Sequence, residues 1–124
     1  MAATWDWVEI RTHDVEATAK FYEELFGWKV TDRVVVDDSP VWLFETGGQP
    51  RVEDLSRGGI WLRKGEAPRI VVYVLVDDLD TSLRRVVELG GSVLEPPLRM
   101  GRGMGALVAD PGGVTFAIYQ FLRT

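Results

Sequence analysis

The sequence predicts an α+β domain in which two βαβββ modules in tandem form a curved, cup-like mixed sheet with the helices outside. Segments with alternating apolar residues, typical of strands, and segments with apolar residues three or four apart, typical of helices, occur twice in the same order. The two halves also align with each other along the chain. Apolar residues make up 46% of the 124 residues, which suffices for one core, and we expect a single domain over residues 1–124.

The first predicted module covers about residues 4–64. Its opening strand, Thr4–Arg11, alternates, so that Val8 and Ile10 share one face. Asp14 has a side chain suited to a helix N-cap, and Gly27 suits the position just after a helix. The buried stripe expected for this helix is Ala17, Phe21, Leu25 and Phe26. The other predicted elements are strands at Trp28–Val36, Val41–Thr46 and Gly58–Arg63, a turn at Asp37–Pro40, a strand end at Gly47–Gly48 and an irregular segment at Gln49–Arg57.

The second predicted module covers about residues 68–122. It begins with a β-branched strand at Arg69–Val76, followed by a helix that Asp78 caps and that runs to about Leu89. The glycines of Gly101–Gly105 resemble a phosphate loop but precede a strand, so we interpret the segment as a mobile loop at the rim of the cup. The other predicted elements are an extended Ser92–Glu95, a loop at Pro96–Gly105, strands at Gly105–Ala109 and Val114–Phe121, and a tight turn at Asp110–Gly113.

The alignment of the two halves favours an internal duplication over chance similarity of two βα units. Apolar, acidic and glycine positions coincide without a gap, and the order of elements agrees. The coinciding pairs are Val8 with Val72, Asp14 with Asp78, Glu24–Leu25 with Glu88–Leu89, Gly27 with Gly91, Leu43 with Leu107 and Gly48 with Gly112.

Charge and hydropathy exclude several classes of partner. The formal net charge is -5 and the sequence pI about 4.8, which argues against nucleic acid and favours a neutral or cationic ligand over an anionic one. No stretch approaches the roughly 18 apolar residues of a membrane helix, and residues 1–7 do not resemble a secretory signal. There is no cysteine, so no disulfide or thiolate ligand is possible. We expect a cytoplasmic protein.

Alternation assigns the faces of each opening strand. Val8 and Ile10, and Val72, Val74 and Val76, are expected to pack under the helices. The residues expected to face the hollow of the cup are Trp7, Glu9 and Arg11 in the first module and Val71, Tyr73 and Leu75 in the second. A concave face with aromatic rings and a few polar groups is a common type of ligand site.

Several motifs resemble those of the vicinal-oxygen-chelate superfamily, which includes glyoxalase I, extradiol dioxygenases and fosfomycin- and bleomycin-resistance proteins. The resemblance covers nearly the whole chain. One departure is Val114, where the family turn usually continues with Asn. The matching segments are Trp7–Ile10, Asp14, Phe21–Tyr22 and Phe26–Trp28 in the first module, and Val76–Leu79, Glu88–Gly91 and Asp110–Gly113 in the second.

The resemblance implies metal ligands on the first and last strand of each module, and this chain lacks them. Carried over by position, the ligands fall on Trp7, about Arg63, Val71 and Ala117. None of these side chains offers the nitrogen or oxygen donor that such a metal needs. The chain therefore resembles a metal-free branch, and we expect no cofactor, with a divalent metal possible but disfavoured. The resemblance also implies a homodimer.

Glu9 and Tyr73 are the candidate catalytic residues. Glu9 faces the expected hollow, where it can act as a base or accept a hydrogen bond from a ligand; the alternative is a salt bridge to Arg11 or Arg63. Tyr73 occupies the equivalent position in the second module and can act as an acid; the alternative is an ordinary sheet aromatic. The predicted ligand-binding set is Trp7, Glu9, Arg11, Trp61, Arg63, Val71, Tyr73, Ala117 and Tyr119.

Four functions remain open at this point. The first is binding of a small aromatic or cationic metabolite or antibiotic, with Trp7 and Trp61 stacking on a planar ring, as in drug-resistance proteins. The second is a metal-independent isomerase, lyase or hydrolase with Glu9 as base. The third is a metal-dependent lyase or dioxygenase with other ligands, such as Glu9, His13 and Glu45, although a lone histidine in a loop is more typical of a solvent-exposed residue. The fourth is an interaction module without a hollow.

Overall fold

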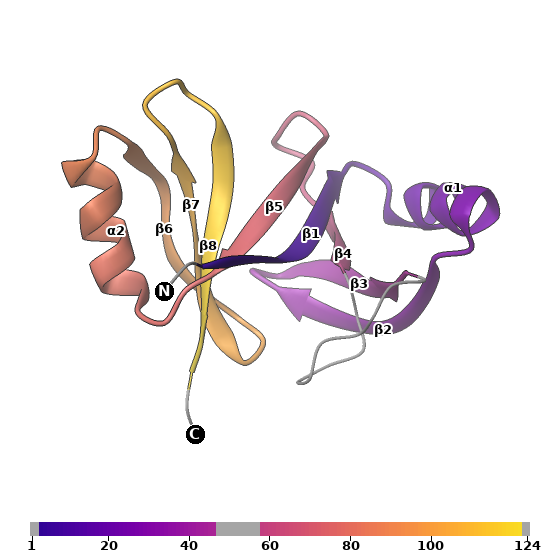
Figure 1. The fold of residues 1–124 in the computed structure, drawn as a ribbon. Helices are drawn as coiled ribbons and strands as arrows, with labels where there is room; N and C mark the ends of the chain where they lie inside the picture. Colours follow the sequence, from indigo (N-terminus) through magenta and orange to yellow (C-terminus); the bar gives the residue numbers. More distant parts are fainter. Residues whose placement is uncertain (1–2, 47–57, 123–124) are drawn as a thin grey trace. The chain divides into compact units, whose positions relative to one another are not determined.

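The computed structural model describes residues 3–46 and 58–122 and has the predicted α+β class (Figure 1). Its residues form two compact units, which we describe separately: the first unit is Trp7–Ile70, and the second unit is Val71–Thr124 with residues 1–6. Each unit contains the order βαβββ. The elements are β1 (Thr4–Thr12), α1 (Val15–Phe26), β2 (Lys29–Val36), β3 (Ser39–Glu45), β4 (Gly58–Leu62), β5 (Arg69–Leu75), α2 (Leu79–Glu88), β6 (Ser92–Met100), β7 (Gly103–Ala109) and β8 (Thr115–Phe121).

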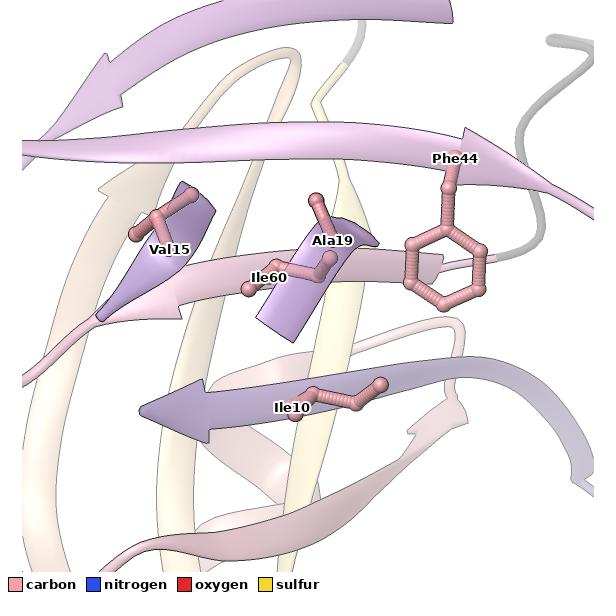
Figure 2. Close-up of a cluster of buried hydrophobic side chains, with 5 residues drawn as sticks. All are labelled: Ile10, Val15, Ala19, Phe44 and Ile60. Carbon is pink, nitrogen blue, oxygen red and sulfur yellow. The ribbon is translucent and has the colours of Figure 1, made fainter. Parts of the chain in front are cut away.

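In the first unit the strands have the order β2-β3-β4-β1. β1 and β4 are parallel, and the other neighbours are antiparallel. Parallel pairing of the first and last strand requires a crossover, which α1 and the β2–β3 hairpin provide. The core lies between α1 and the sheet and consists of Ile10, Val15, Ala19, Phe44 and Ile60 (Figure 2).

The second unit has the same arrangement, with the strand order β5-β8-β7-β6 and a parallel β5–β8 pair. Its core consists of Leu79, Ala106, Val108 and Ile118, with Val76 and Leu83 packed against it. The predicted tight turn at Asp110–Gly113 is confirmed, because the Asp110 carboxylate accepts hydrogen bonds from the backbone N–H groups of Gly112 and Val114. The tandem βαβββ organisation is therefore confirmed.

The helices of the two modules begin in the same way. Asp14 and Asp78 each accept a hydrogen bond from the backbone N–H three residues later, at 3.0 Å in both cases. The helix ends differ. Gly27 takes the left-handed conformation after α1, as predicted, whereas Gly90 rather than Gly91 does so after the shorter α2.

The predicted buried stripe of the first helix is wrong. Phe21, Leu25 and Phe26 are more than half exposed, and Ala17 is also exposed; Val15 and Ala19 face the sheet instead. The helix contains two sets of apolar residues at helical spacing, and the smaller side chains allow it to approach the strands closely. Ile10 lies under α1 as predicted, but Val8 is exposed.

Two predicted loops are also shorter in the structure. Asp37 and Asp38 alone form the β2–β3 turn, with φ of 53° and 59°, so Ser39 and Pro40 belong to β3. β6 continues through Pro96 and Pro97 to Met100, and β7 begins at Gly103. β6 is the outermost strand of its unit and has shifts of register around Glu95, which is where a sheet tolerates proline.

Part of the sequence-based prediction lies outside the described residues. This applies to Gly47–Gly48, including the pairing of Gly48 with Gly112, and to the irregular Gln49–Arg57. No helix in the described parts of the chain is both long and apolar enough to cross a membrane.

Candidate functional site

The candidate site of the first unit is the face of β1 and β4 that points away from α1. In the parallel register Glu9 is opposite Gly59 and Arg11 is opposite Trp61. Because side chains alternate along a strand, Trp7, Glu9 and Arg11 share the face opposite Ile10, which packs under α1. The structure thus brings together four of the predicted ligand-binding residues of this unit.

Glu9 and Arg11 form a buried ion pair. The Arg11 Nε donates to the Glu9 carboxylate at 2.8 Å, and the two side chains are 1% and 7% exposed. Arg11 Nη1 donates to the Glu66 carboxylate at 3.0 Å. The arrangement corresponds to the salt-bridge alternative for Glu9, and it gives the carboxylate a structural role whatever else it does.

Trp61 is held between arginines rather than open to a ligand. The guanidinium carbons of Arg63 and Arg11 lie 4.2 and 5.0 Å from its ring centroid, and its indole N–H donates to the Val36 carbonyl at 3.2 Å. Trp61 is 1% exposed. The expectation that its ring stacks on a planar ligand is therefore not supported, because cation–π contacts already cover it.

Glu66, which was not among the predicted residues, joins three arginines. Its carboxylate accepts hydrogen bonds from Arg11, Arg63 and Arg69 at 2.9–3.0 Å. Burial raises the pKa of Glu66, but the hydrogen bonds from Arg63 and Arg11 outweigh that effect and lower its pKa to about 2. This carboxylate therefore remains ionised at any physiological pH and cannot serve as a base.

Arg63 and His13 also contact Glu66. Burial lowers the pKa of Arg63, but hydrogen bonds to Glu66 and Asp37 outweigh burial and raise it above its ordinary value. His13, the only histidine, is exposed, and its Nε2 lies 2.6 Å from the Glu66 carbonyl, to which it donates. The predicted exposure of His13 is therefore confirmed.

The low pKa of Glu66 predicts a pH-dependent loss of stability for the Glu66→Gln variant. A carboxylate whose pKa falls on folding stabilises the fold above its ordinary pKa of 4.5, and this contribution disappears as the pH falls toward 2. Because the group is partly exposed, we expect the variant to lose only about 1–2 kcal/mol at pH 7 and progressively less below pH 4.5. Urea unfolding at pH 7, 4 and 2.5 measures this trend, and a loss that does not vary with pH would contradict it.

The candidate site of the second unit is the corresponding face of β5 and β8. Tyr73 is opposite Ala117 in the parallel register, and Leu75 is opposite Tyr119. Val71, Tyr73 and Ala117 are at most 3% exposed. The Tyr73 and Tyr119 rings lie 6.4 Å apart edge to face.

Both tyrosine hydroxyls point to the same residue of β6. The Tyr73 hydroxyl contacts the Met100 sulfur at 3.7 Å, and the Tyr119 hydroxyl donates to the Met100 carbonyl at 2.6 Å. The face of β5 and β8 therefore carries two phenol groups beside Met100.

The strand register corrects one of the carried-over metal positions. Glu9 and Tyr73 occupy equivalent positions in the two modules. Glu9 is opposite Gly59, and Tyr73 is opposite Ala117. Gly59, rather than Arg63, is therefore the counterpart of Ala117. The position expected from the sequence was four residues too late, because it assumed too long an extra segment before the last strand of the first module.

The residues at these positions do not fit a divalent metal. A Cβ built on Gly59 would lie 3.3 Å from Trp7 Cζ2 and 3.0 Å from Val41 Cγ1, so the indole already occupies the space beside this strand. Val71 and Ala117 have no donor atoms. Among residues 3–46 and 58–122, no group of three histidine, cysteine, aspartate or glutamate side chains is placed to hold a metal, which leaves the set Glu9, His13 and Glu45 without support.

The duplicated βαβββ fold and these two strand faces define a class of protein. A model of the Glyoxalase/Bleomycin resistance protein/Dioxygenase superfamily matches residues 4–118, and the chain belongs to this superfamily.

Curated proteins from Mycobacterium and Streptomyces match most of this chain. The chain is 31% identical to the "Putative glyoxylase CFP32" of Mycobacterium tuberculosis, over 97% of this chain and 46% of that protein. It is 34% identical to the "Anthracycline biosynthesis protein DauV" of Streptomyces sp. (strain C5), over 92% of this chain and 40% of that protein. The chain therefore spans less than half the length of these curated relatives.

Solved structures show the same fold at lower sequence identity. The methylmalonyl-CoA epimerase from Mycobacterium tuberculosis superimposes with a TM-score of 0.70 and 20% identity, covering 99% of this chain and 94% of that chain. The Streptomyces coelicolor methylmalonyl-CoA epimerase gives a TM-score of 0.75 with 16% identity, covering 100% and 98%. At this identity the likeness concerns the fold alone.

Proposed function

We propose that this chain binds a small planar aromatic molecule, neutral or cationic, without a metal ion. The observation that supports it best is the packing of the Trp7 indole beside Gly59. By the resemblance described above, these are the strand positions at which metal-dependent members of the superfamily carry metal ligands. A half-buried indole replaces a coordinating group with a surface for aromatic stacking. Val71 and Ala117 make the equivalent positions of the second unit apolar as well.

The ligand-binding residues of this proposal lie on the face of β1 and β4 in the first unit. Trp7 supplies the aromatic surface for this ligand. The ion pair of Arg11 and Glu9 lies on the same face. One relative is named for anthracycline biosynthesis, and anthracyclines have a planar fused-ring system, which is the ligand chemistry proposed here.

The rival is metal-independent catalysis with Glu9 as base and Tyr73 as acid. A base must give up its hydrogen bonds to reach a substrate proton, and the 2.8 Å bond from the buried Arg11 opposes this. The binding function is therefore the better supported of the two. Turnover that disappears in Glu9→Gln while binding persists would favour the enzyme instead.

The test is a titration with the anthracycline daunorubicin, followed by tryptophan quenching and thermal shift, with and without a chelator. We expect saturable binding that stabilises the protein, is unchanged by the chelator, and weakens about tenfold or more in Trp7→Leu. Trp5→Leu is the matched control, because it removes a 79% exposed indole from the same strand and is expected to leave the affinity unchanged. Binding that the chelator abolishes, or equal affinities of Trp7→Leu and the wild type, would refute the proposal.

A further inference from the structure

A pocket with a volume of about 450 Å³ lies in the first unit beside α1. Its lining comes from the end of β1, from α1, from Pro68 and from the first two residues of β5. Trp7 and Glu9 do not line it, so it is distinct from the strand face described above. The volume is within the range of small-molecule sites, roughly 300–1,000 Å³.

The walls of this pocket are largely apolar and partly aromatic. Phe21 and Tyr22 contribute rings that meet edge to face at a centroid distance of 5.2 Å. Ile10 and Ile70 provide aliphatic surface, and the side chains of Phe21 and Ile70 are 58% and 59% exposed. A hollow lined with exposed aromatic and aliphatic groups favours an aromatic ring over a hydrated ion.

The charge of the pocket is of one sign. Its charged lining residues are Arg11 and Arg69, and none of the described residues that line it is acidic. Arg11 is 2% exposed and is engaged by Glu9 and Glu66. Arg69 is different, because one third of its side chain is exposed. It is therefore the cation available to a ligand.

Arg69 also has unused hydrogen-bonding capacity. Its Nη2 donates to Glu66, which it shares with Arg11 and Arg63, whereas its Nε–H is buried and has no partner in the part of the chain that the structure describes. The buried Nε–H is out of a ligand's reach, so a ligand meets the exposed part of the Arg69 side chain. The exposed N–H groups of a guanidinium pair well with a carboxylate.

We infer that this pocket binds a small aromatic carboxylate, whose ring lies against Phe21, Tyr22 and Ile70 and whose carboxylate pairs with Arg69. The sign of this ligand is opposite to the one that the net charge of -5 favours, because the charged residues that line the pocket act on a bound ligand at closer range than the rest of the protein. The inference is independent of the proposed function, which concerns the face that carries Trp7.

The test is calorimetric titration of the protein with 2-naphthoate and with its neutral analogue 2-naphthamide. We expect saturable binding of the acid, binding of the amide at least about tenfold weaker, and a loss of about tenfold or more for the acid in Arg69→Gln. Arg84→Gln, on the exposed surface of α2, is the control and should bind like the wild type. Equal binding of acid and amide, or no binding of the acid at millimolar concentration, would overturn the inference.

Two variants that place opposite charges at Ile70 provide a test that does not depend on the Glu66 network. Ile70→Glu and Ile70→Lys remove the same exposed apolar side chain at the mouth of the pocket and differ in sign. We expect Ile70→Glu to weaken 2-naphthoate binding about tenfold more than Ile70→Lys does. Equal effects of the two variants would refute pairing with Arg69. Trp7→Leu should leave 2-naphthoate binding unchanged, and a loss in that variant would place the ligand on the other face.

Discussion

Arg11→Met is expected to destabilise the protein by about 3–5 kcal/mol, far more than removal of an exposed arginine. The side chain is 1% exposed and pairs with Glu9 at 2.8 Å and Glu66 at 3.0 Å. Methionine has a similar length but no charge, so the variant removes the guanidinium while keeping most of the packing. The Glu9 carboxylate, itself 7% exposed, then loses its closest cation. Urea unfolding at pH 7 measures the effect.

Arg85→Met is the matched control for this experiment. Arg85 and Glu88 form an ion pair of the same length, 2.8 Å, but their side chains are 59% and 60% exposed. Exposed pairs contribute about 0–1 kcal/mol, so this variant should lose no more than that. Similar losses for Arg11→Met and Arg85→Met would show that burial does not strengthen the first pair.

A double-mutant cycle between Glu9 and Arg11 separates the pair from the packing around it. If the large loss in Arg11→Met arises from the carboxylate left behind, Glu9→Gln combined with Arg11→Met should be less destabilised than the sum of the single variants. We expect a coupling of about 1–3 kcal/mol. The cycle also bears on function, because a carboxylate kept for catalysis commonly costs stability, so its removal would be neutral or stabilising. Destabilisation by Glu9→Gln alone would support the structural role.

The features that were predictable from the sequence are those set by local chemistry. The caps at Asp14 and Asp78 depend on a hydrogen bond three residues away, so a single side chain at the right spacing identifies them. The tight turn at Asp110–Gly113 is local in the same sense. Because these signals occur in the same order in both halves, the duplicated fold could be inferred even though several element boundaries were wrong.

The buried face of α1 was not predictable from periodicity alone. Phe21 and Leu25 have helical spacing and large side chains, but Val15 and Ala19 have the same spacing and form the contact with the sheet. Periodicity shows that apolar residues form a stripe along the helix, but it does not show which of two stripes faces the sheet. Which stripe faces the strands depends on how closely the helix must approach, and this is a property of the packed unit.

The sequence predicted which residues share a strand face at the site, but it did not predict which residues those side chains contact. Alternation along β1 placed Glu9 and Arg11 on one face, which the ion pair confirms. Glu66 could not be found in this way, because it is far from Arg11 in the sequence and follows no helix or strand pattern. Gly59 was missed for a different reason: its position depends on the parallel register with Glu9, and counting residues through an insertion gave Arg63 instead.

Phe44→Ala is expected to cost about 3–5 kcal/mol, because it empties the end of the first unit's core. Phe44 is 3% exposed and packs with Ile10 and Ile60 under α1 (Figure 2). Its ring stacks on Trp28 at a centroid distance of 5.5 Å and an interplanar angle of 12°. Truncation therefore removes both buried apolar area and an aromatic pair.

The neighbouring strands leave little room for the core to close around the missing ring. Gly58 is next to Phe44 in the β3–β4 register, and a Cβ built on it would lie 2.6 Å from the Phe44 ring and 2.4 Å from the Val8 carbonyl oxygen. The backbones are thus already in close contact beside the ring, so collapse is limited and the loss should lie in the upper part of the range. Val35→Ala, at a 70% exposed position of β2, is the control and should lose less than about 1 kcal/mol. Urea unfolding followed by tryptophan fluorescence compares the two variants. A loss below about 2 kcal/mol for Phe44→Ala would mean that the sheet and α1 move together to fill the space, and that the core of the first unit is more deformable than its close contacts indicate.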